Sequence, residues 1–151
     1  MMAQEDRLGD ELVICLVVDR ADLRLRLEAA VIDASLPGRL DVLEDAGALT
    51  RYLSGEGEFA LFAGEAPPGL ILLDLQPPEL LPLITTLRAD RRARAVPVIV
   101  ITPGPVEGGW VKELYAAGVS SVVIRPPSFD GLVDLMSLLG RYWLQLVTLS
   151  A

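Results

Sequence analysis

The stretch that decides the fold is Gly69-Leu-Ile-Leu-Leu73, an apolar run that is followed directly by Asp74. Short, continuous apolar runs are typical of strands buried on both faces, as in a parallel sheet covered by helices. The segment Glu11-Leu-Val-Ile-Cys-Leu-Val-Val18 has the same character and also ends at an aspartate, Asp19. We therefore predict that both segments are buried strands of one parallel α/β sheet.

Strand and helix patterns alternate along the rest of the chain. Gly118 follows the fourth helix as a C-terminal glycine, and Pro82 is expected in the first turn of the third. The predicted strands are residues 11–18, 40–43, 69–73, 96–102 and 120–125, and the predicted helices are 21–35, 46–54, 79–89, 106–117 and 129–147. This alternation predicts a flavodoxin-like (βα)5 fold, a doubly wound five-stranded parallel sheet in the order 2-1-3-4-5. We expect residues 1–10 to form a flexible tail and residues 11–151 a single domain with a C-terminal helix extension.

Composition removes several classes of function. The 151 residues include no histidine, which excludes Ser-His-Asp and Cys-His catalysis and histidine metal sites. The single cysteine, Cys15, lies in an apolar run and is expected to be a buried hydrophobic side chain. The formal charge of −8 disfavours nucleic acid as a partner, because affinity for phosphates comes from Lys and Arg. The arginines of residues 88–94 are expected to form a solvated helix end. No membrane-spanning run or signal peptide is apparent, so we predict a cytoplasmic protein with no membrane association.

Four polar residues stand where predicted strands end: Asp19, Asp74, Thr102 and Arg125. Ligands of doubly wound sheets bind at this edge, and in the predicted order the strands that carry the two aspartates are neighbours. Two converging carboxylates need a shared proton or a cation, and their hard oxygens suit Mg²⁺. The hydroxyl and the guanidinium could hold the oxygens of a bound phosphoryl group.

These landmarks resemble those of the receiver domains of two-component response regulators. The resemblance rests on Ile71-Leu-Leu-Asp74-Leu, Val96-Pro-Val-Ile-Val-Ile-Thr102, Ala117-Gly118 and Arg125-Pro126, and it spans about Leu12 to Leu149. Two further segments, Ser54-Gly-Glu-Gly-Glu-Phe59 and Arg141-Tyr-Trp-Leu-Gln-Leu-Val-Thr-Leu149, are similar to the small stand-alone receivers associated with bacterial phytochromes.

The resemblance implies a role for each site residue. Asp74 would be the phosphoacceptor, and Mg²⁺ would be held by Asp19, Asp74 and the backbone carbonyl of Gln76. Thr102 would bond to the phosphoryl group, and Arg125 would stand in the place of the lysine of the family. The implied partner is a sensor histidine kinase, with a phytochrome-type photoreceptor as one candidate. The protein would then be no enzyme beyond self-catalysed aspartyl phosphorylation and dephosphorylation.

The chain departs from the pattern of the family at several positions. The family has two adjacent acids after the first strand, but here the first is Val18, and Asp22 is expected to point away from the pocket. Arginine at 125 replaces a lysine, which is not a conservative change. Val122 stands where an aromatic switch residue is usual, and the segment after Asp74 appears about two residues short. These departures keep open an alternative, a pseudo-receiver that acts as a phosphorylation-independent binding or dimerisation module.

Two further expectations concern output and other chemistries. We predict a homodimer through the face made by the fourth helix, the fifth strand and the fifth helix, because aromatic residues are enriched at interfaces. The aromatic residues of that face are Trp110, Tyr115, Phe129, Tyr142 and Trp143. A third reading, a flavin carrier or dinucleotide enzyme on the same architecture, would need a phosphate-binding loop that residues 19–22 do not provide.

Overall fold

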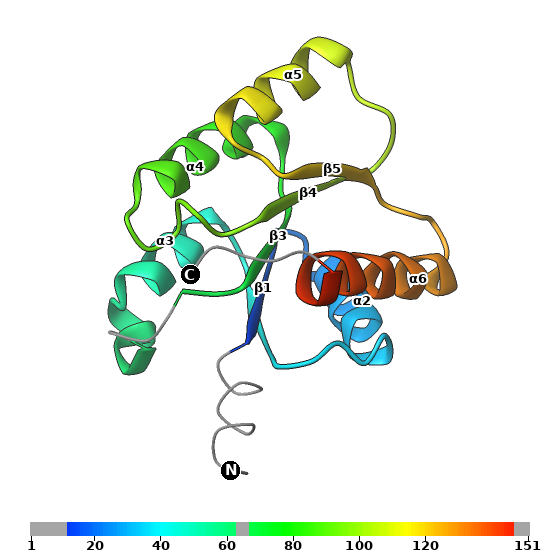
Figure 1. Ribbon diagram of the computed structural model, residues 1–151, viewed down its shortest axis with the longest axis horizontal. Coiled ribbons are helices and arrows are strands. Elements are labelled where there is room, and N and C mark those ends of the chain that lie inside the picture. Colours follow the sequence, from blue (N-terminus) through cyan, green and yellow to red (C-terminus); the bar gives the residue numbers. More distant parts are fainter. Residues whose placement is uncertain (1–11, 63–66, 147–151) are drawn as a thin grey trace.

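The protein forms a five-stranded parallel sheet with helices on both faces, as seen in the computed structural model (Figure 1). The structure describes residues 12–62 and 67–146; the predicted tail and the end of the last predicted helix lie outside these ranges. The strands are β1 (Val13–Val18), β2 (Arg39–Leu43), β3 (Leu70–Asp74), β4 (Val98–Thr102) and β5 (Ser121–Ile124). Their order, β2-β1-β3-β4-β5, confirms the predicted doubly wound fold.

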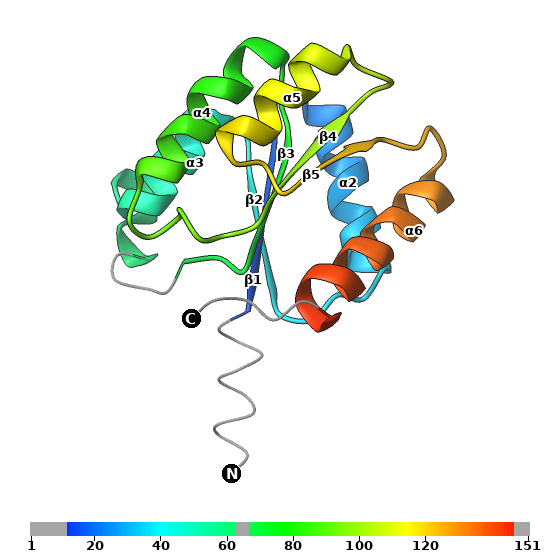
Figure 2. The same ribbon diagram turned by 45° about the horizontal axis from the view of Figure 1, so that its top comes forward.

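Helices cover both faces of the sheet. They are α2 (Ala21–Asp33), α3 (Ala46–Ser54), α4 (Pro77–Ala89), α5 (Gly108–Ala117) and α6 (Phe129–Gly140), with short helical turns η1 (Gly57–Phe62) and η2 (Arg141–Leu146). Figure 2 shows α2 and α6 on one face and α3, α4 and α5 on the other. The described helices and strands thus form three layers with a core on each side of the sheet.

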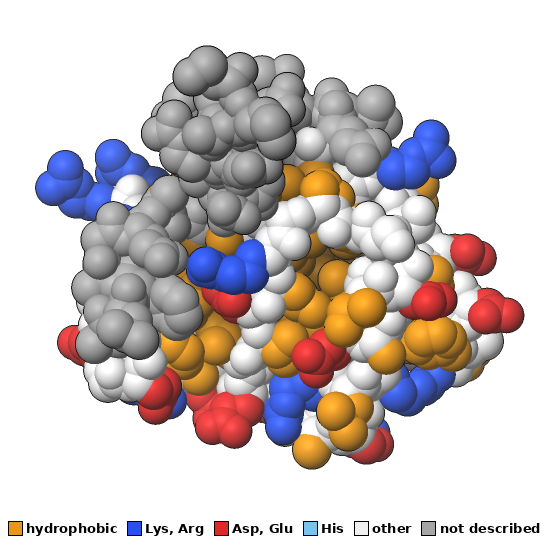
Figure 3. Space-filling view, turned by 90° about the horizontal axis from the view of Figure 1, so that it is seen from below, with side chains coloured by type: hydrophobic (Ala, Val, Ile, Leu, Met, Phe, Trp, Pro, Cys, Tyr) orange, Lys and Arg blue, Asp and Glu red, His pale blue; other side chains and the backbone are white. Residues whose placement is uncertain are grey.

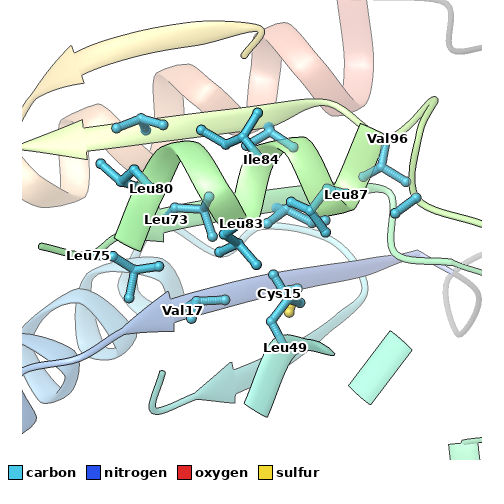
Figure 4. Close-up of a cluster of buried hydrophobic side chains, with 14 of the residues drawn as sticks. Cys15, Val17, Leu49, Leu73, Leu75, Leu80, Leu83, Ile84, Leu87 and Val96 are labelled. Carbon is cyan, nitrogen blue, oxygen red and sulfur yellow. The ribbon is translucent and has the colours of Figure 1, made fainter. Parts of the chain in front are cut away.

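The alternation of side chains along each strand builds these two cores. In β1, Cys15 and Val17 point toward the helices of one face, whereas Ile14, Leu16 and Val18 point toward the other. All six residues of β1 are buried. Figure 4 shows the first cluster, in which Leu80, Leu83 and other side chains of α4 lie over the sheet. Continuous apolar strands are therefore what a doubly covered sheet requires.

Helix α4 begins earlier than the sequence predicts. It starts at Pro77. Proline suits the first helical positions because the N–H groups there have no partner within the helix, so the N–H that proline lacks is not needed. The expectation that Pro82 lies in the first turn is therefore wrong: it lies inside the helix, in the second turn. Pro82 has no N–H to pair with the carbonyl of Pro78, and both prolines are exposed.

Arg88 is the largest departure from the expected solvated helix end. Its guanidinium donates to the carbonyls of Gly118 (3.0 and 2.6 Å), Ala93 (3.3 Å), Arg94 (2.9 Å) and Val96 (2.8 Å). This side chain therefore ties the end of α4 to the turn before β4 and to the end of α5. A Cβ atom at Gly118, where φ is +113°, would lie 2.7 Å from the Arg88 Nε atom, so only glycine fits there.

Other predicted boundaries shift by a few residues for local reasons. Strand β4 begins at Val98 and not at residue 96. The carbonyl of Pro97, just before the strand, accepts a hydrogen bond from the Ile71 N–H at 3.0 Å. The predicted fifth helix ends as an α-helix at Gly140 and continues as the short π-helix η2. The loop expected after α3 contains the short helix η1, and Phe59 of this helix contacts the Tyr52 ring edge to face.

The edge strand β5 has one notable contact. The Val122 N–H donates to the phenol oxygen of Tyr115 at 3.0 Å, so α5 reaches over the edge of the sheet. On the face shown in Figure 3, basic side chains are scattered among acidic ones. In the described part of the chain, no helix is long and apolar enough to cross a bilayer.

Candidate functional site

The four polar residues at the strand ends meet in one pocket. Asp19 follows β1, Asp74 ends β3, Thr102 ends β4 and Arg125 follows β5, and all four line a cavity of about 140 Å³. Asp74 comes close to Asp19 because β1 and β3 are hydrogen-bonded neighbours, with Val18 paired in register with Asp74. The convergence predicted from the sheet order is thus what the structure has.

The walls of this pocket are largely apolar. Leu80 contributes from α4, and Val106 and Trp110 contribute from the start of α5 and the loop before it. Trp110 also packs against the core cluster beneath α4, so it is not part of a free aromatic surface. Apolar walls lower the local dielectric, which strengthens the interactions among the charged groups on the pocket floor.

Asp74 and Arg125 form an ion pair on that floor. The Arg125 Nη1 donates to Asp74 Oδ2. The side chain of Asp74 is only 9% exposed and that of Arg125 only 15%. Burial raises the pKa of the Asp74 carboxyl above its ordinary value, whereas the hydrogen bond and the charge of Arg125 act in the opposite direction. Arg125 is therefore the group that compensates the buried charge of Asp74.

Asp19 is held from the segment that follows β3. Its Oδ2 accepts a hydrogen bond from the backbone N–H of Gln76 at 3.1 Å. Glu79 lies in the first turn of α4 and is exposed. Desolvation raises the pKa of the Glu79 carboxyl, and its interaction with Asp19 raises that pKa further.

Thr102 is buried, and its hydroxyl is already engaged. The Oγ1 donates to the carbonyl of Gly104 at 3.0 Å, within the loop that leads to α5. The loop geometry and the position of this hydroxyl are therefore coupled. A group that bound to Thr102 from the pocket would compete with this bond.

The remaining expectations for this region can be compared with the structure. Asp22 is exposed, pairs with Arg20 at 3.4 Å and does not line the pocket. Val18 is fully buried in the core beneath α2 and contributes no oxygen to the site. Val122 is partly buried against the opposite core.

The oxygen donors present fit a divalent cation by their chemistry. Asp19 and Asp74 offer carboxylates and Gln76 offers a backbone carbonyl, the hard ligands that Mg²⁺ prefers. As the side chains stand, Arg125 holds one oxygen of Asp74. Among residues 12–62 and 67–146, no three acidic or thiol groups are arranged to hold a metal ion. Binding of a cation by this set would thus compete with Arg125 for Asp74.

Comparison with known proteins gives both sequence and structural relatives. No family model matches the chain. It is 29% identical over 138 residues to the "Probable methanogenesis regulatory protein FilR2" of Methanothrix harundinacea, covering 89% of this chain and 85% of that protein.

Solved structures superimpose over nearly the whole chain. The phosphorylated cyanobacterial phytochrome response regulator RcpA matches with a TM-score of 0.78 and 22% identity, over 93% of this chain and 99% of that one. The Mn²⁺-bound response regulator Rcp1 matches with 0.76 and 24%, over 93% and 99%. The bacteriophytochrome response regulator RtBRR matches with 0.69 and 29%, over 93% and 81%.

This chain has the fold of a response regulator receiver domain. The resemblance found in the sequence is thereby confirmed, including the likeness to the small phytochrome-associated receivers. Its neighbours are signalling domains, and one of them, Rcp1, binds a divalent metal ion. In this receiver fold, the pocket with Asp74 lies at the carboxyl edge of the sheet, where ligands of doubly wound proteins bind.

Proposed function

We propose that this protein is a single-domain response regulator that accepts a phosphoryl group on Asp74 and signals through protein–protein contacts. The observation that carries the proposal is the buried Asp74 carboxylate at the end of β3, with Arg125 bonded to it and Thr102 lining the same pocket. A carboxylate, a cation and a hydroxyl are what aspartyl-phosphate chemistry needs in one place.

The proposed step is a transfer from a phosphorylated histidine of a sensor kinase. A carboxylate oxygen of Asp74 attacks the phosphorus, the bond from phosphorus to the histidine nitrogen breaks, and an acyl phosphate forms. Because Arg125 engages Oδ2, we expect Oδ1 to attack and Arg125 to pair with the transferred group. Mg²⁺ held by Asp19, Asp74 and the Gln76 carbonyl would supply charge neutralisation for the phosphoryl oxygens.

Partners and location follow from the same proposal. We propose a sensor histidine kinase as the phosphodonor, with a phytochrome-type photoreceptor as the first candidate, because the structural relatives include phytochrome response regulators. We also propose a cytoplasmic homodimer that uses the face of α5, β5 and α6. Tyr115 of α5 and Tyr142 of η2, which continues α6, are 46% and 51% exposed, which supports this choice. We expect no enzymatic activity beyond the self-catalysed steps, and no binding to nucleic acid or membranes.

One specific set of observations supports a second candidate function. Val18 supplies no acid, and the guanidinium of Arg125 already pairs with Asp74 in a buried site. A receiver whose acceptor is held in this way could act as a phosphorylation-independent binding or dimerisation module. In that case its output would depend on the α5–β5–α6 face alone.

Phosphorylation with acetyl phosphate separates the two functions. We would incubate the full chain and its Asp74→Asn variant with the donor, with and without Mg²⁺, and measure the intact mass. A gain of one phosphoryl group that requires Mg²⁺ and Asp74 supports the response regulator. If the folded protein gains no mass while an ordinary receiver is labelled alongside, the binding module is the better description.

Sedimentation tests the dimer independently. At concentrations of tens of micromolar and above, the full chain is expected to sediment as a dimer, and Tyr142→Asp should shift it toward the monomer. A wild-type chain that remains monomeric over this range would contradict the proposed interface.

A further inference from the structure

The cavity above Asp74 has an aromatic wall. Trp110, in the first turn of α5, lines this cavity together with Leu80 of α4 and Val106 of the loop before α5. Because Asp74 lies on the cavity floor and is buried, a phosphodonor that reaches it through this cavity has to enter between these side chains. The walls therefore contact the part of the donor that leaves once the phosphoryl group is transferred.

The indole of Trp110 is held in place from its other side. It is partly buried and packs against the core cluster beneath α4. Gly108 and Gly109 precede it in the same helical turn, and a Cβ atom built at Gly108 would meet nothing within 4 Å. The ring is thus fixed by packing, and the two residues before it place no side chain beside it.

The proposed transfer leaves a departing group in this cavity. When a phosphorylated imidazole is the donor, an oxygen of Asp74 bonds to phosphorus and the bond from phosphorus to nitrogen breaks. The electron pair stays on that nitrogen, and the ring, which carries a proton on its other nitrogen, departs as neutral imidazole. When acetyl phosphate is the donor, the electron pair stays on oxygen and acetate departs with a negative charge. An apolar wall accommodates a neutral, flat ring at less cost than a carboxylate.

The charges around the cavity act in the same direction. Asp19 lines it, and the transferred phosphoryl group is itself an anion, so a departing acetate meets like charge. The two arginines that line the cavity are already paired, Arg125 with Asp74 and Arg20 with Asp22. A leaving group without charge avoids this repulsion.

We propose that Trp110 selects the phosphodonor of this protein by stacking against the imidazole ring of a phosphorylated histidine. The inference rests on the proposed function and adds a specificity-determining residue to it. Stacking favours only those donors whose leaving group is a flat ring. An aromatic pair of this kind contributes enough to change a rate by about three- to tenfold.

Three small donors separate the ring from the rest of the donor. Phosphoimidazole has a bond from phosphorus to nitrogen and a ring, phosphoramidate has the bond without the ring, and acetyl phosphate has neither. We would measure the initial rate at which each donor, at low concentration with Mg²⁺, adds mass to the full chain. Trp110→Leu should slow the reaction with phosphoimidazole by about three- to tenfold and leave the other two rates unchanged. Trp110→Phe, which keeps a ring, should react with phosphoimidazole at close to the wild-type rate.

The matched control is Trp143→Leu. Trp143 is partly buried against the core cluster on the opposite face of the sheet, so this substitution removes the same ring at a distance from the cavity. The three rates should keep their wild-type proportions. Circular dichroism establishes that each variant is folded; if Trp110→Leu is not, Trp110→Met, which also lacks a ring, takes its place.

The proportions of the three rates decide the inference. A loss confined to phosphoimidazole supports the role of Trp110. Equal slowing with all three donors, or no slowing with phosphoimidazole, overturns that role and leaves the phosphoacceptor function intact. If none of the donors adds mass to the folded wild-type chain, the phosphoacceptor function itself fails, and the selection of donors by Trp110 fails with it.

Discussion

Removing the guanidinium that pairs with Asp74 should destabilise the protein in a manner that depends on pH. The test variant is Arg125→Met, which keeps an unbranched apolar stem but removes the charge. Asp74 is then left in a site where its side chain is 9% exposed and burial already raises its pKa. Breaking a buried pair in this way typically costs about 3–5 kcal/mol.

The acid chemistry of Asp74 sets an upper limit on this cost. An unpaired carboxylate can lose its charge by binding a proton. For an ordinary pKa of 3.8, this protonation costs about 4 kcal/mol at pH 7. Water in the pocket reduces the penalty, so we expect a loss of about 3 kcal/mol at this pH. The loss arises because the folded-state pKa of Asp74 in the variant lies above the unfolded value.

The sign of the pH dependence follows from that difference. Below the ordinary pKa of the carboxyl, Asp74 is protonated in both states and the variant should lose less than about 1 kcal/mol. As the pH rises toward the raised folded-state pKa of Asp74, the deficit grows, and above that pKa it stays constant. Urea denaturation followed by circular dichroism, at about pH 3 and about pH 7, measures both values.

Two comparison variants make the interpretation specific. Arg125→Lys keeps a positive charge and should retain most of the stability, whereas adding Asp74→Asn to Arg125→Met should recover most of the loss. A deficit that is the same at both pH values, or one below about 0.5 kcal/mol at pH 7, would refute the view that Arg125 compensates a buried charge.

Three further predictions concern other parts of the molecule. Arg88→Ala removes the side-chain donor to the partly buried carbonyls of Gly118 and Val96 and should lower the free energy of unfolding by about 3 kcal/mol. The exposed Arg91→Ala should change it little, and equal effects of the two variants in urea denaturation would refute the carbonyl contacts of Arg88. Thr102→Val loses the bond to Gly104 and should cost about 1 kcal/mol in the same assay, whereas Thr102→Ser should not. Cys15 is fully buried with a raised pKa, so a thiol reagent should label it only as fast as the chain unfolds; rapid labelling of the native protein would contradict its burial.

The sequence was sufficient for the sheet because burial on both faces leaves a plain signature. The apolar runs that end at Val18 and Leu73 can bury all of their side chains only in a strand that is covered by helices on both faces. Once the strand order is inferred, the convergence of Asp19 and Asp74 follows, since residues at the same end of neighbouring parallel strands must meet. The pocket that contains Asp74 was therefore predictable in outline.

Contacts between segments distant in sequence were not predictable. The arginine run that contains Arg88 looks like a charged helix end, but the carbonyls that it binds include that of Gly118, thirty residues away.

The bond from the Val122 N–H to the Tyr115 hydroxyl has a consequence for how copies of this chain can meet. An edge strand with free donors invites another strand to extend the sheet, which is a common route to aggregation. Here the phenol occupies a donor in the middle of β5, so strand addition at this edge would first have to displace a tyrosine. Association of two copies at this edge must then proceed through side-chain contacts, which can be specific. Tyr115→Phe frees the Val122 N–H and is expected to favour non-specific strand addition and aggregation.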